Sequence, residues 1–387
     1  MRIFVLGAGA TGSVLAQLLE RQGHEVSCGD RDPERARHFL GKSSTIPIAA
    51  VNARNMRAII RAARGSHMLV NASPAVFNEI ILRAALHLRA HYLDMSAHLT
   101  RNPFKAEQLR FEKRFQQKNR AALILAGVAP GLTNLLVKRG AEQFDEVNAV
   151  EVRLYENTES DDPVSQWSPE ASFDEATSRP RIYRNGRFAL APRFGEREKF
   201  RFPQPIGEVA VYLAAQDEVG TLPHFLKLRN MDVKIGGNEF EMLRRWYRQG
   251  KLSKARGMRR AHFPATLTPR QMKKLVKRGG LANARFAAVV LIRGTKDGEP
   301  LLLRTDAIFP SLFQLHRLGT ANSLIGWATA QMAALFVKHF PRDEAGVFAP
   351  EALPAEIRKA ILKDARARGI RILSKLSRLK KDEDAED

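Results

Sequence analysis

The chain begins with a glycine-rich turn between an apolar run and an amphipathic segment. Gly7, Gly9 and Gly12 follow the run Ile3–Leu6, which is typical of a buried parallel strand, and Ser13–Glu20 places its leucines on one helical face. In such a turn one glycine permits the tight bend, another lets the backbone approach a pyrophosphate, and the third lets helix and strand pack closely. The order strand, glycine turn, helix therefore predicts a parallel α/β unit here, with a turn suited to binding a dinucleotide.

An acidic residue stands where the second strand of such a unit ends. Asp30 follows the expected strand His24–Cys28, about 20 residues past the last glycine, where a carboxylate binds the adenine ribose hydroxyls. A carboxylate there favours NAD because it repels a 2′-phosphate, whereas the neighbouring Arg31 is suited to binding that phosphate. We expect NAD or NADP, with NAD favoured; an α/β turn without a ligand is the alternative. The cofactor contacts expected in this unit are Gly7, Gly9, Ala10, Thr11, Gly12, Asp30 and Arg31.

Strand-like and helix-like stretches alternate through the first third of the chain. The strands are expected within His67–Asn78, His91–Ser96 and Ala121–Gly127, and the helices at Arg54–Arg64, Glu79–Arg89 and Pro103–Asn119. This alternation predicts the α/β class with a doubly wound parallel sheet.

Ligands of a doubly wound sheet lie beyond the carboxyl ends of its strands. We expect one crevice there, lined by Gly7–Gly12, Asn71–Pro74, Asp94–His98 and Gly127–Thr133. The segment that begins at Asn71 should lie by the ribose or the nicotinamide, with a plain strand-to-helix turn as the alternative. The further cofactor contacts expected from this edge are Asn71, Ala72, Ser73, Ser96, Gly127, Pro130 and Gly131.

The pattern changes near Phe144. The stretch EVNAVEVRLYEN alternates apolar and polar residues with the period of a half-buried strand, and the chain mixes strands and helices up to about Gly319 before helical periodicity returns. A length of 387 residues also favours two domains. We expect a dinucleotide-binding domain over 1–128, an α+β substrate domain over 129–320, a C-terminal helical segment over 321–375 and a disordered charged tail over 376–387.

Composition limits the compartment and the partners. The single cysteine, Cys28, allows no intramolecular disulfide and fits a reducing compartment, where it is expected to pack as a small apolar residue. No stretch has the pattern of a signal peptide or the apolar length of a membrane span, so we expect a cytoplasmic protein without a membrane partner.

The net charge of +22 makes a polyanion partner an open alternative. The basic residues are spread widely, with a denser stretch over Arg244–Arg278 that lacks the aromatic pattern of RNA-binding modules. A solvated or oligomer-facing surface is therefore favoured over nucleic-acid binding.

Several stretches in order along the chain together resemble the saccharopine dehydrogenase family. They are GAGATG, DRDPERA, LVNASPAVFN, HYLDMSA, AGVAPGLTN, WSPEAS, YRNGR, TLPHFL and the closing GVFAPEALPAEIRKAILKDARARGIRI. The resemblance implies a Rossmann domain, an inserted α+β catalytic domain, and C-terminal helices that pack back on the first domain. It further implies NAD(P)-dependent oxidoreduction at a carbon–nitrogen bond of an amino-acid-derived amine or imine, such as saccharopine, carboxynorspermidine or lysine, by a homodimer.

One position departs from the family pattern. Gln216 stands two residues before the Glu of EVGTLP, where family members often carry a histidine. The departure leaves open the substrate and a second class of function, a nucleotide-binding sensor or scaffold without turnover whose basic surface binds polyanions.

The candidate catalytic residues are Asp94, His98 and Trp167. Asp94 is suited to orienting a base or the cofactor, with a structural turn-capping carboxylate as the alternative. His98 is a candidate acid or base because histidine is the usual side chain for proton transfer near neutral pH, with a bystander loop residue as the alternative. Trp167 is expected to wall the pocket or to pack in the core. Three arginines could bind a substrate carboxylate, and no cluster has the spacing of metal ligands. These arginines are Arg153, Arg181 and Arg184.

Overall fold

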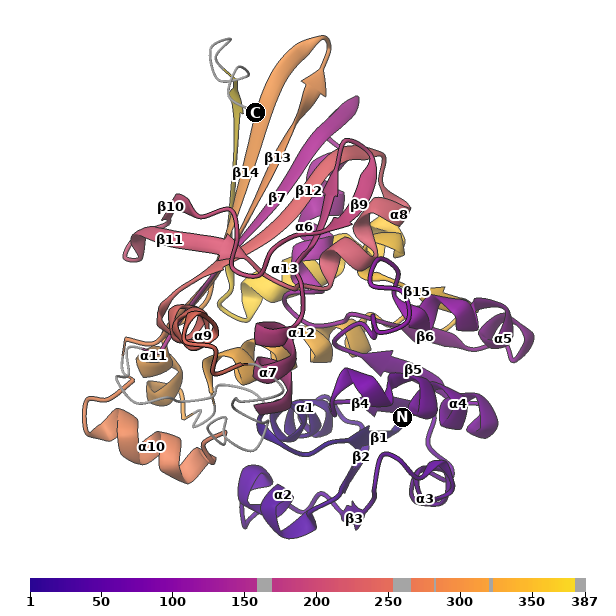
Figure 1. Ribbon diagram of the computed structural model, residues 1–387. Helices are drawn as coiled ribbons and strands as arrows, with labels where there is room; N and C mark the ends of the chain where they lie inside the picture. The colour runs from indigo at the N-terminus through magenta and orange to yellow at the C-terminus, as the bar shows by residue number, and fades with distance from the viewer. Residues whose placement is uncertain (159–168, 253–265, 282, 320–322, 380–387) are drawn as a thin grey trace.

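The chain folds into two stacked units, seen in a computed structural model (Figure 1). The structure describes residues 1–158, 169–252, 266–281, 283–319 and 323–379. The first unit, in indigo and purple, lies at the bottom of Figure 1, and the long strands of the second unit rise above it.

The first unit is built on a parallel sheet of seven strands. Its order is β3-β2-β1-β4-β5-β6-β15, the Rossmann order with one further strand at the edge. All its neighbours pair in parallel. The strands are β1 (Arg2–Leu6), β2 (Glu25–Asp30), β3 (Ile48–Ala50), β4 (Met68–Asn71), β5 (His91–Asp94), β6 (Ala121–Leu123) and β15 (Gly346–Phe348).

Helices cover both faces of this sheet. Alternate residues of β1 point to opposite sides: Ile3 and Val5 belong to one apolar core, and Phe4 and Leu6 to the other. The first core is covered by α1 (Ala10–Arg21), α2 (Pro33–Leu40) and α12 (Leu324–Lys338). The second core lies under α3 (Met56–Ala62), α4 (Asn78–Leu88) and α5 (Glu112–Gln117).

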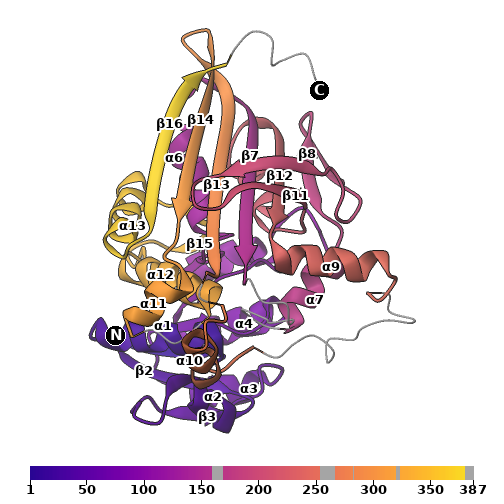
Figure 2. The same ribbon diagram turned by 90° about the vertical axis from the view of Figure 1, so that its left-hand side faces the viewer.

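The second unit is built on a mixed sheet of nine strands. Its main path is β10-β11-β12-β7-β13-β14-β16, with β8 pairing β12 and β9 (Figure 2). Only β12 and β7 pair in parallel among its described strands. The strands are β7 (Glu146–Asn157), β8 (Arg181–Arg184), β9 (Arg187–Leu190), β10 (Glu198–Phe202), β11 (Gly207–Leu213), β12 (Leu228–Gly236), β13 (Arg285–Lys296), β14 (Glu299–Ile308) and β16 (Arg371–Arg378).

Helices of the second unit pack along its sheet and at its junction with the first. Helix α6 (Leu132–Ala141) lies against β13, where a Cβ on Gly140 would meet Ile292 Cδ1 at 2.5 Å, so the glycine permits the close approach. The others described are α7 (Pro169–Thr177), α8 (Leu222–Phe225), α9 (Asn238–Arg248), α10 (Pro269–Lys277) and α11 (Leu312–Arg317).

The C-terminal part of the chain joins both units. Helix α12 packs on α1 and β15 extends the first sheet, whereas α13 (Ala355–Ala367) packs on α6 and β16 pairs with β14. The predicted fold class, a doubly wound sheet with a second α+β part and C-terminal helices packed back on the first, is therefore confirmed. The predicted domain boundaries at 128, 320 and 375 stay predictions.

Two local predictions need correction. The charged tail was expected from residue 376, but β16 continues to Arg378 because its backbone pairs with β14. The helix expected over Pro103–Asn119 is instead a 3-10 turn, η2 (Glu107–Phe111), followed by α5. The residues before η2 reach the second unit, where the Ala106 N–H donates to the Gly220 carbonyl at 3.1 Å.

None of the described helices combines the length and the apolar character that a membrane crossing needs.

Candidate active site

The glycine turn is packed as tightly as its expected role requires. A Cβ on Gly12 would meet the Gly7 carbonyl oxygen at 1.8 Å, and a Cβ on Gly7 would meet the Ala72 carbonyl at 2.7 Å. Gly7 also has a φ of +98°, a conformation that favours glycine. Gly9 differs, because a Cβ there would meet no heavy atom of the described residues within 4 Å. The space beside Gly9 is therefore open to a ligand.

Helix α1 begins at this open space. Gly9 is its N-cap and supplies no side-chain hydrogen bond, and the first turn contains no acidic residue. The first N–H groups of a helix have no acceptor within it, and the helix dipole favours an anion at that end. The residues at the turn, Ala10, Thr11 and Gly12 among them, thus fit a dinucleotide pyrophosphate.

Asp30 lies at the end of β2 and connects to the glycine turn. Its Oδ2 accepts from the Ala8 N–H at 2.8 Å, and its Oδ1 accepts from the Asp32 N–H at 3.0 Å. Each carboxylate oxygen can accept a second hydrogen bond, so ribose hydroxyls can still bind. Arg31 is exposed beside it, at the position where a 2′-phosphate would need a cation.

The loop after β4 is fixed by a buried asparagine. Asn71 Oδ1 accepts from the Ser73 N–H at 2.9 Å and from the Ser73 hydroxyl at 2.5 Å. Asn71 Nδ2 donates to Asn78 Oδ1 at 2.6 Å, and Asn78 Nδ2 donates to the Ser96 carbonyl at 2.8 Å. These bonds hold the loops that follow β4 and β5 side by side at the carboxyl edge of the sheet. That Asn71, Ala72, Ser73 and Ser96 contact the cofactor stays a prediction.

The Asp94 carboxylate is buried and surrounded by hydrogen-bond donors from neighbouring segments. Its carboxylate, 1% exposed, accepts from Tyr92 Oη at 3.0 Å, Gln108 Nε2 at 3.0 Å and the Leu125 N–H at 2.8 Å. Burial raises the pKa of Asp94 to about 7, against the opposing effect of these hydrogen bonds. The geometry favours a positioning role for Asp94, which ties β5 to the turn after β6.

His98 lies on the same loop and faces a second carboxylate. Its Nε2 is 2.8 Å from Thr100 Oγ1, and its Nδ1 is 3.5 Å from Glu107 Oε2. The ring is half-buried against the first unit. Its role as an acid or base stays a prediction.

The turn after β6 closes this edge. A Cβ on Gly131 would meet the Gly127 carbonyl oxygen at 2.1 Å, and a Cβ on Gly127 would lie 3.3 Å from the Met95 carbonyl oxygen. The Gly131 N–H donates to Asn134 Oδ1 at 3.0 Å, and Pro130, which precedes Gly131, is buried. The expected segments at Gly127–Gly131 and after β5 therefore lie together, as the strand order requires.

Polar contacts lead from this edge into the second unit. The Ala97 N–H donates to Asp217 Oδ2 at 2.8 Å, and Asp217 Oδ1 lies 4.0 Å from Arg181 Nη1. The neighbouring Gln216, at the position of the family histidine, donates from Nε2 to Glu175 Oε1 at 2.6 Å. The carboxyl edge of the first sheet thus faces titratable groups of β8, η3 (Glu218–Gly220) and α7.

Glu175 belongs to an acidic cluster that also contains Glu156 and Glu239. They come from the end of β7, from α7 and from the first turn of α9. Burial raises the pKa of Glu175 to about 7 and, with the charge of Glu175, that of Glu239 to about 8. Burial and both neighbouring charges raise the pKa of Glu156 well above its usual range. Such carboxyl groups hold or accept a proton near neutral pH.

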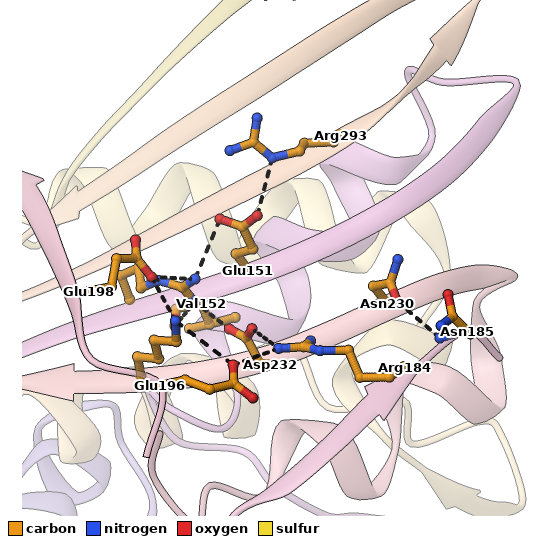
Figure 3. A network of polar contacts seen from close by, with 11 residues as sticks. Glu151, Val152, Arg184, Asn185, Glu196, Glu198, Asn230, Asp232 and Arg293 are labelled. Carbon is orange, nitrogen blue, oxygen red and sulfur yellow. Dashed lines mark hydrogen bonds and ion pairs between the residues drawn. The ribbon is translucent and has the colours of Figure 1, made fainter. Parts of the chain in front are cut away.

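Two of the three candidate arginines are occupied elsewhere. Arg153 Nη1 donates to Asp232 Oδ1 at 2.5 Å, and Arg184 Nη2 donates to Asp232 Oδ2 at 2.7 Å. Figure 3 shows Arg184 between Asp232 and Glu196, within a network that extends to Glu198, Glu151 and Arg293. These arginines stabilise the second sheet and are not placed to bind a substrate.

Arg181 differs from them. Its Nη1 donates to the Ala215 carbonyl at 3.3 Å, and its Nε is buried without a hydrogen-bond partner among the described residues. Burial lowers its pKa, although the charge of Asp217 opposes this effect. This Nε–H is suited to a planar anion such as a carboxylate.

Some groups of this site were absent from the sequence-based expectations. Glu156 and Glu239 carry no local signal, because one ends an alternating strand and the other begins an ordinary amphipathic helix. Only the fold brings them beside Glu175. Trp167, expected at the pocket wall, lies outside the described residues, and its role stays a prediction.

Comparison with known proteins agrees with this architecture. Residues 3–123 match the family model of the saccharopine dehydrogenase NADP binding domain. The whole fold is similar to that of apo saccharopine dehydrogenase (L-Glu forming) from Saccharomyces cerevisiae, with a TM-score of 0.68 at 13% identity over 97% of this chain and 99% of that chain. The dinucleotide-binding part of the chain thus matches the saccharopine dehydrogenase family model, and the whole chain shares the fold of that enzyme. The resemblance expected from the sequence motifs is thereby confirmed, and with it a nicotinamide dinucleotide-binding fold.

The chain also shares a short segment with a curated protein of another kind. That segment is 54% identical over 43 residues to the Trk system potassium uptake protein TrkA of Streptomyces coelicolor, and it makes up 11% of this chain and 19% of that protein. The match thus spans about a fifth of the curated relative and concerns that segment alone.

Proposed function

We propose that this chain is an NAD(P)-dependent oxidoreductase that transfers a hydride at a carbon–nitrogen bond of an amino-acid-derived amine or imine. The substrate would be saccharopine-, carboxynorspermidine- or lysine-like. The observation that carries the proposal is the arrangement of the acidic cluster and Arg181 beyond the carboxyl edge of the dinucleotide-binding sheet. An amino acid carries an ammonium group, which would face the acidic cluster, and a carboxylate, which would face Arg181.

Arg181 is proposed to bind the substrate carboxylate. A guanidinium presents a planar fork of donors that matches a carboxylate, and the buried Nε of Arg181 has no hydrogen-bond partner among the described residues. A bound carboxylate would satisfy that donor and hold the reacting carbon at a fixed distance.

Glu175 is proposed to accept the proton of the substrate ammonium. An amine must be neutral before its carbon can give up a hydride, because the imine forms with the nitrogen lone pair. Glu175 is half-buried, its pKa lies at about 7, and Gln216 holds one of its oxygens. When bound, the nicotinamide supplies the hydride acceptor or donor.

The test is oxidation of these amines by the full chain with NAD⁺ and NADP⁺, followed at the nicotinamide absorbance. We expect turnover of one of them, with a rate that rises with pH through about 7, as Glu175 loses its proton and can act as a base. Glu175→Gln should lower kcat by about 10²- to 10⁴-fold and remove that rise. Arg181→Lys should chiefly raise KM.

The matched control is Arg184→Lys, because Arg184 is bound to Asp232 and Glu196 in the second sheet. Its kinetics should equal those of the unaltered chain. A Glu175→Gln variant that kept the same kcat and the same rise with pH would contradict the proposed base.

We further propose NAD as the preferred cofactor, a homodimer as the oligomeric state and the cytoplasm as the compartment. The NAD preference is supported by the carboxylate of Asp30 at the ribose position. The other two rest on the family resemblance and on the single cysteine, Cys28. Cys28 is buried, and burial raises its pKa to about 12, so it packs as an inert residue.

One observation favours a second function, a sensor or scaffold that binds a polyanion. A surface groove of about 350 Å³ lies between α6 and α13 and has five cationic side chains and one carboxylate. Burial and the charge of Arg139 lower the pKa of Arg366 across the groove, which shows that the positive charges are close enough to repel. The groove is lined by Arg139, Glu142, Ala355, Arg358, Lys359, Leu362, Lys363 and Arg366.

A further inference from the structure

Three polar side chains distant in sequence converge beside the loop after β5. Glu79 comes from the first turn of α4, His98 from the loop, and Glu107 from the first residue of η2. One ligand atom of each, a carboxylate oxygen or a ring nitrogen, lies within 4.8 Å of the other two. We call these three residues the His98 cluster.

The converging atoms are shielded from solvent and face one another. Glu79 Oε1, His98 Nδ1 and Glu107 Oε2 receive no N–H or O–H hydrogen bond from another described residue, and the two carboxyl groups are close enough to share a proton. The Glu107 side chain is only 4% exposed, and its Oε2 is 3.5 Å from His98 Nδ1. Buried polar atoms are almost always paired, so three acceptor atoms that face one another need a proton or a cation between them.

The other polar atom of each residue is already held. Glu107 Oε1 accepts from the Thr100 N–H at 2.9 Å and the Arg101 N–H at 2.7 Å, and His98 Nε2 is 2.8 Å from Thr100 Oγ1. Glu79 Oε2 forms an ion pair with Arg110. Hydrogen bonds of this kind orient the side chains that bind a metal ion. If the His98 Nε2–H donates to Thr100 Oγ1, the ring nitrogen Nδ1 carries no proton and can bind a cation.

We propose that the His98 cluster binds a divalent metal ion of the Zn²⁺ type through Glu79, His98 and Glu107. One imidazole nitrogen and two carboxylate oxygens form a donor set that suits Zn²⁺ better than Mg²⁺, which prefers oxygen ligands alone. Ligand atoms at about 2.1 Å from a tetrahedral ion lie about 3.4 Å apart, close to the separation of His98 Nδ1 and Glu107 Oε2. Three protein ligands leave the fourth position to water.

The charge around the cluster permits this assignment. Two carboxylates offset the ion's charge; the competing cations are Arg110, paired with Glu79 Oε2, and Arg101, whose Nε lies 3.9 Å from Glu107 Oε2. Because the Arg101 side chain is 70% exposed, it can turn into solvent when an ion enters. The alternative has no metal: a proton shared between Glu79 and Glu107, with an ion pair between a protonated His98 and Glu107.

The ion would brace the contact between the two units. The loop that it closes carries the Ala97 N–H bonded to Asp217, the Ala106 N–H bonded to Gly220, and the Phe104 carbonyl oxygen 2.7 Å from His224 Nε2. Metal binding should therefore raise the unfolding temperature of the full chain as well as order the loop.

The test is calorimetric titration of ZnCl₂ into the full chain after dialysis against a chelator, with MnCl₂ and MgCl₂ in parallel. We expect one Zn²⁺ per chain, a raised unfolding temperature, and weaker binding of Mg²⁺. His98→Ala and Glu107→Gln should remove this binding and the rise, and Thr100→Val should weaken affinity about 10- to 100-fold. Glu79→Gln, at a side chain 15% exposed, provides a variant less disturbing to the fold.

The control is His87→Ala, since His87 is an exposed histidine on the same helix as Glu79. It should bind Zn²⁺ as the unaltered chain does. Failure of the unaltered chain to bind Zn²⁺, or binding that His98→Ala and Glu79→Gln leave unchanged, would overturn the site and favour the His98–Glu107 ion pair. The readout needs no nicotinamide and no turnover, so it is independent of the proposed reaction.

Discussion

The three glycines of the N-terminal turn do different things, although they look alike in the sequence. Gly7 and Gly12 are required by the protein itself, because a Cβ on either would overlap backbone atoms. Gly9 has open space instead, so the protein's own packing gives no reason for a glycine there. The absent side chain at Gly9 is explained by a ligand that approaches the backbone.

This difference predicts opposite effects for two equivalent substitutions. Gly9→Ala should leave the unfolding temperature nearly unchanged but weaken dinucleotide binding at least about tenfold, because the methyl group lies where the pyrophosphate would. Gly12→Ala should lower the free energy of unfolding by about 1–3 kcal/mol through overpacking against Gly7. Thermal unfolding and a nucleotide titration of both variants provide the measurement. Equal loss of stability in the two variants would contradict the assignment.

Residues with a local signal could be predicted, and residues assembled by the fold could not. The glycine turn and Asp30 could be predicted because their spacing falls within one strand–turn–helix unit. Asp94 was placed correctly on its strand, yet its enclosure by Tyr92, Gln108 and Leu125 depends on segments far apart in sequence. The acidic cluster and the His98 cluster depend on the same long-range packing.

Among the helices, the basic groove between α6 and α13 does not coincide with the densest run of basic residues in the sequence. The densest basic stretch in the sequence, Arg244–Arg278, is only partly described, and within it Arg244 forms an ion pair with Glu241 and lies over the Tyr212 ring. The groove between α6 and α13 instead draws cations from two helices more than 200 residues apart. Helical spacing on each element puts those cations on one face.

A polyanion should therefore bind the groove rather than α10. We expect the double variant Lys363→Glu, Arg366→Glu to weaken binding of a labelled DNA duplex and to reduce its dependence on salt concentration. The matched control Lys273→Glu, Lys277→Glu changes α10 by the same charge and should have the smaller effect. Fluorescence anisotropy across a salt series measures both. A larger loss from the α10 variant would contradict the assignment of the groove.

The ends of elements were harder to predict than the elements themselves. Strands β1, β4 and β5 were expected close to their observed positions, because each is an apolar run with a clear end. The stretch expected as one helix over 103–119 splits into a loop, η2 and α5, since its first residues bind the second unit. Charged β16 pairs with β14 although its side chains are mostly exposed.

In the whole molecule, the candidate site depends on how the two units meet. The first supplies a carboxyl edge built for a dinucleotide, and the second brings Arg181, Gln216 and Glu175 toward it through the bond between Ala97 and Asp217. Neither unit holds the complete candidate site. The proposed reaction therefore needs both, and the dinucleotide is its first requirement.

The most direct test is a titration of the full chain with NADH and NADPH, followed by nicotinamide fluorescence, and repeated with Asp30→Ala and Asp30→Asn. We expect binding in the micromolar range or tighter, with NADH preferred. Asp30→Ala should weaken the binding of NADH more than that of NADPH. Asp30→Asn keeps an acceptor for the Ala8 N–H, so its affinity shows how much of the lost binding depends on the negative charge. A chain that bound neither nucleotide would contradict the account, and the glycine turn would then be structural only.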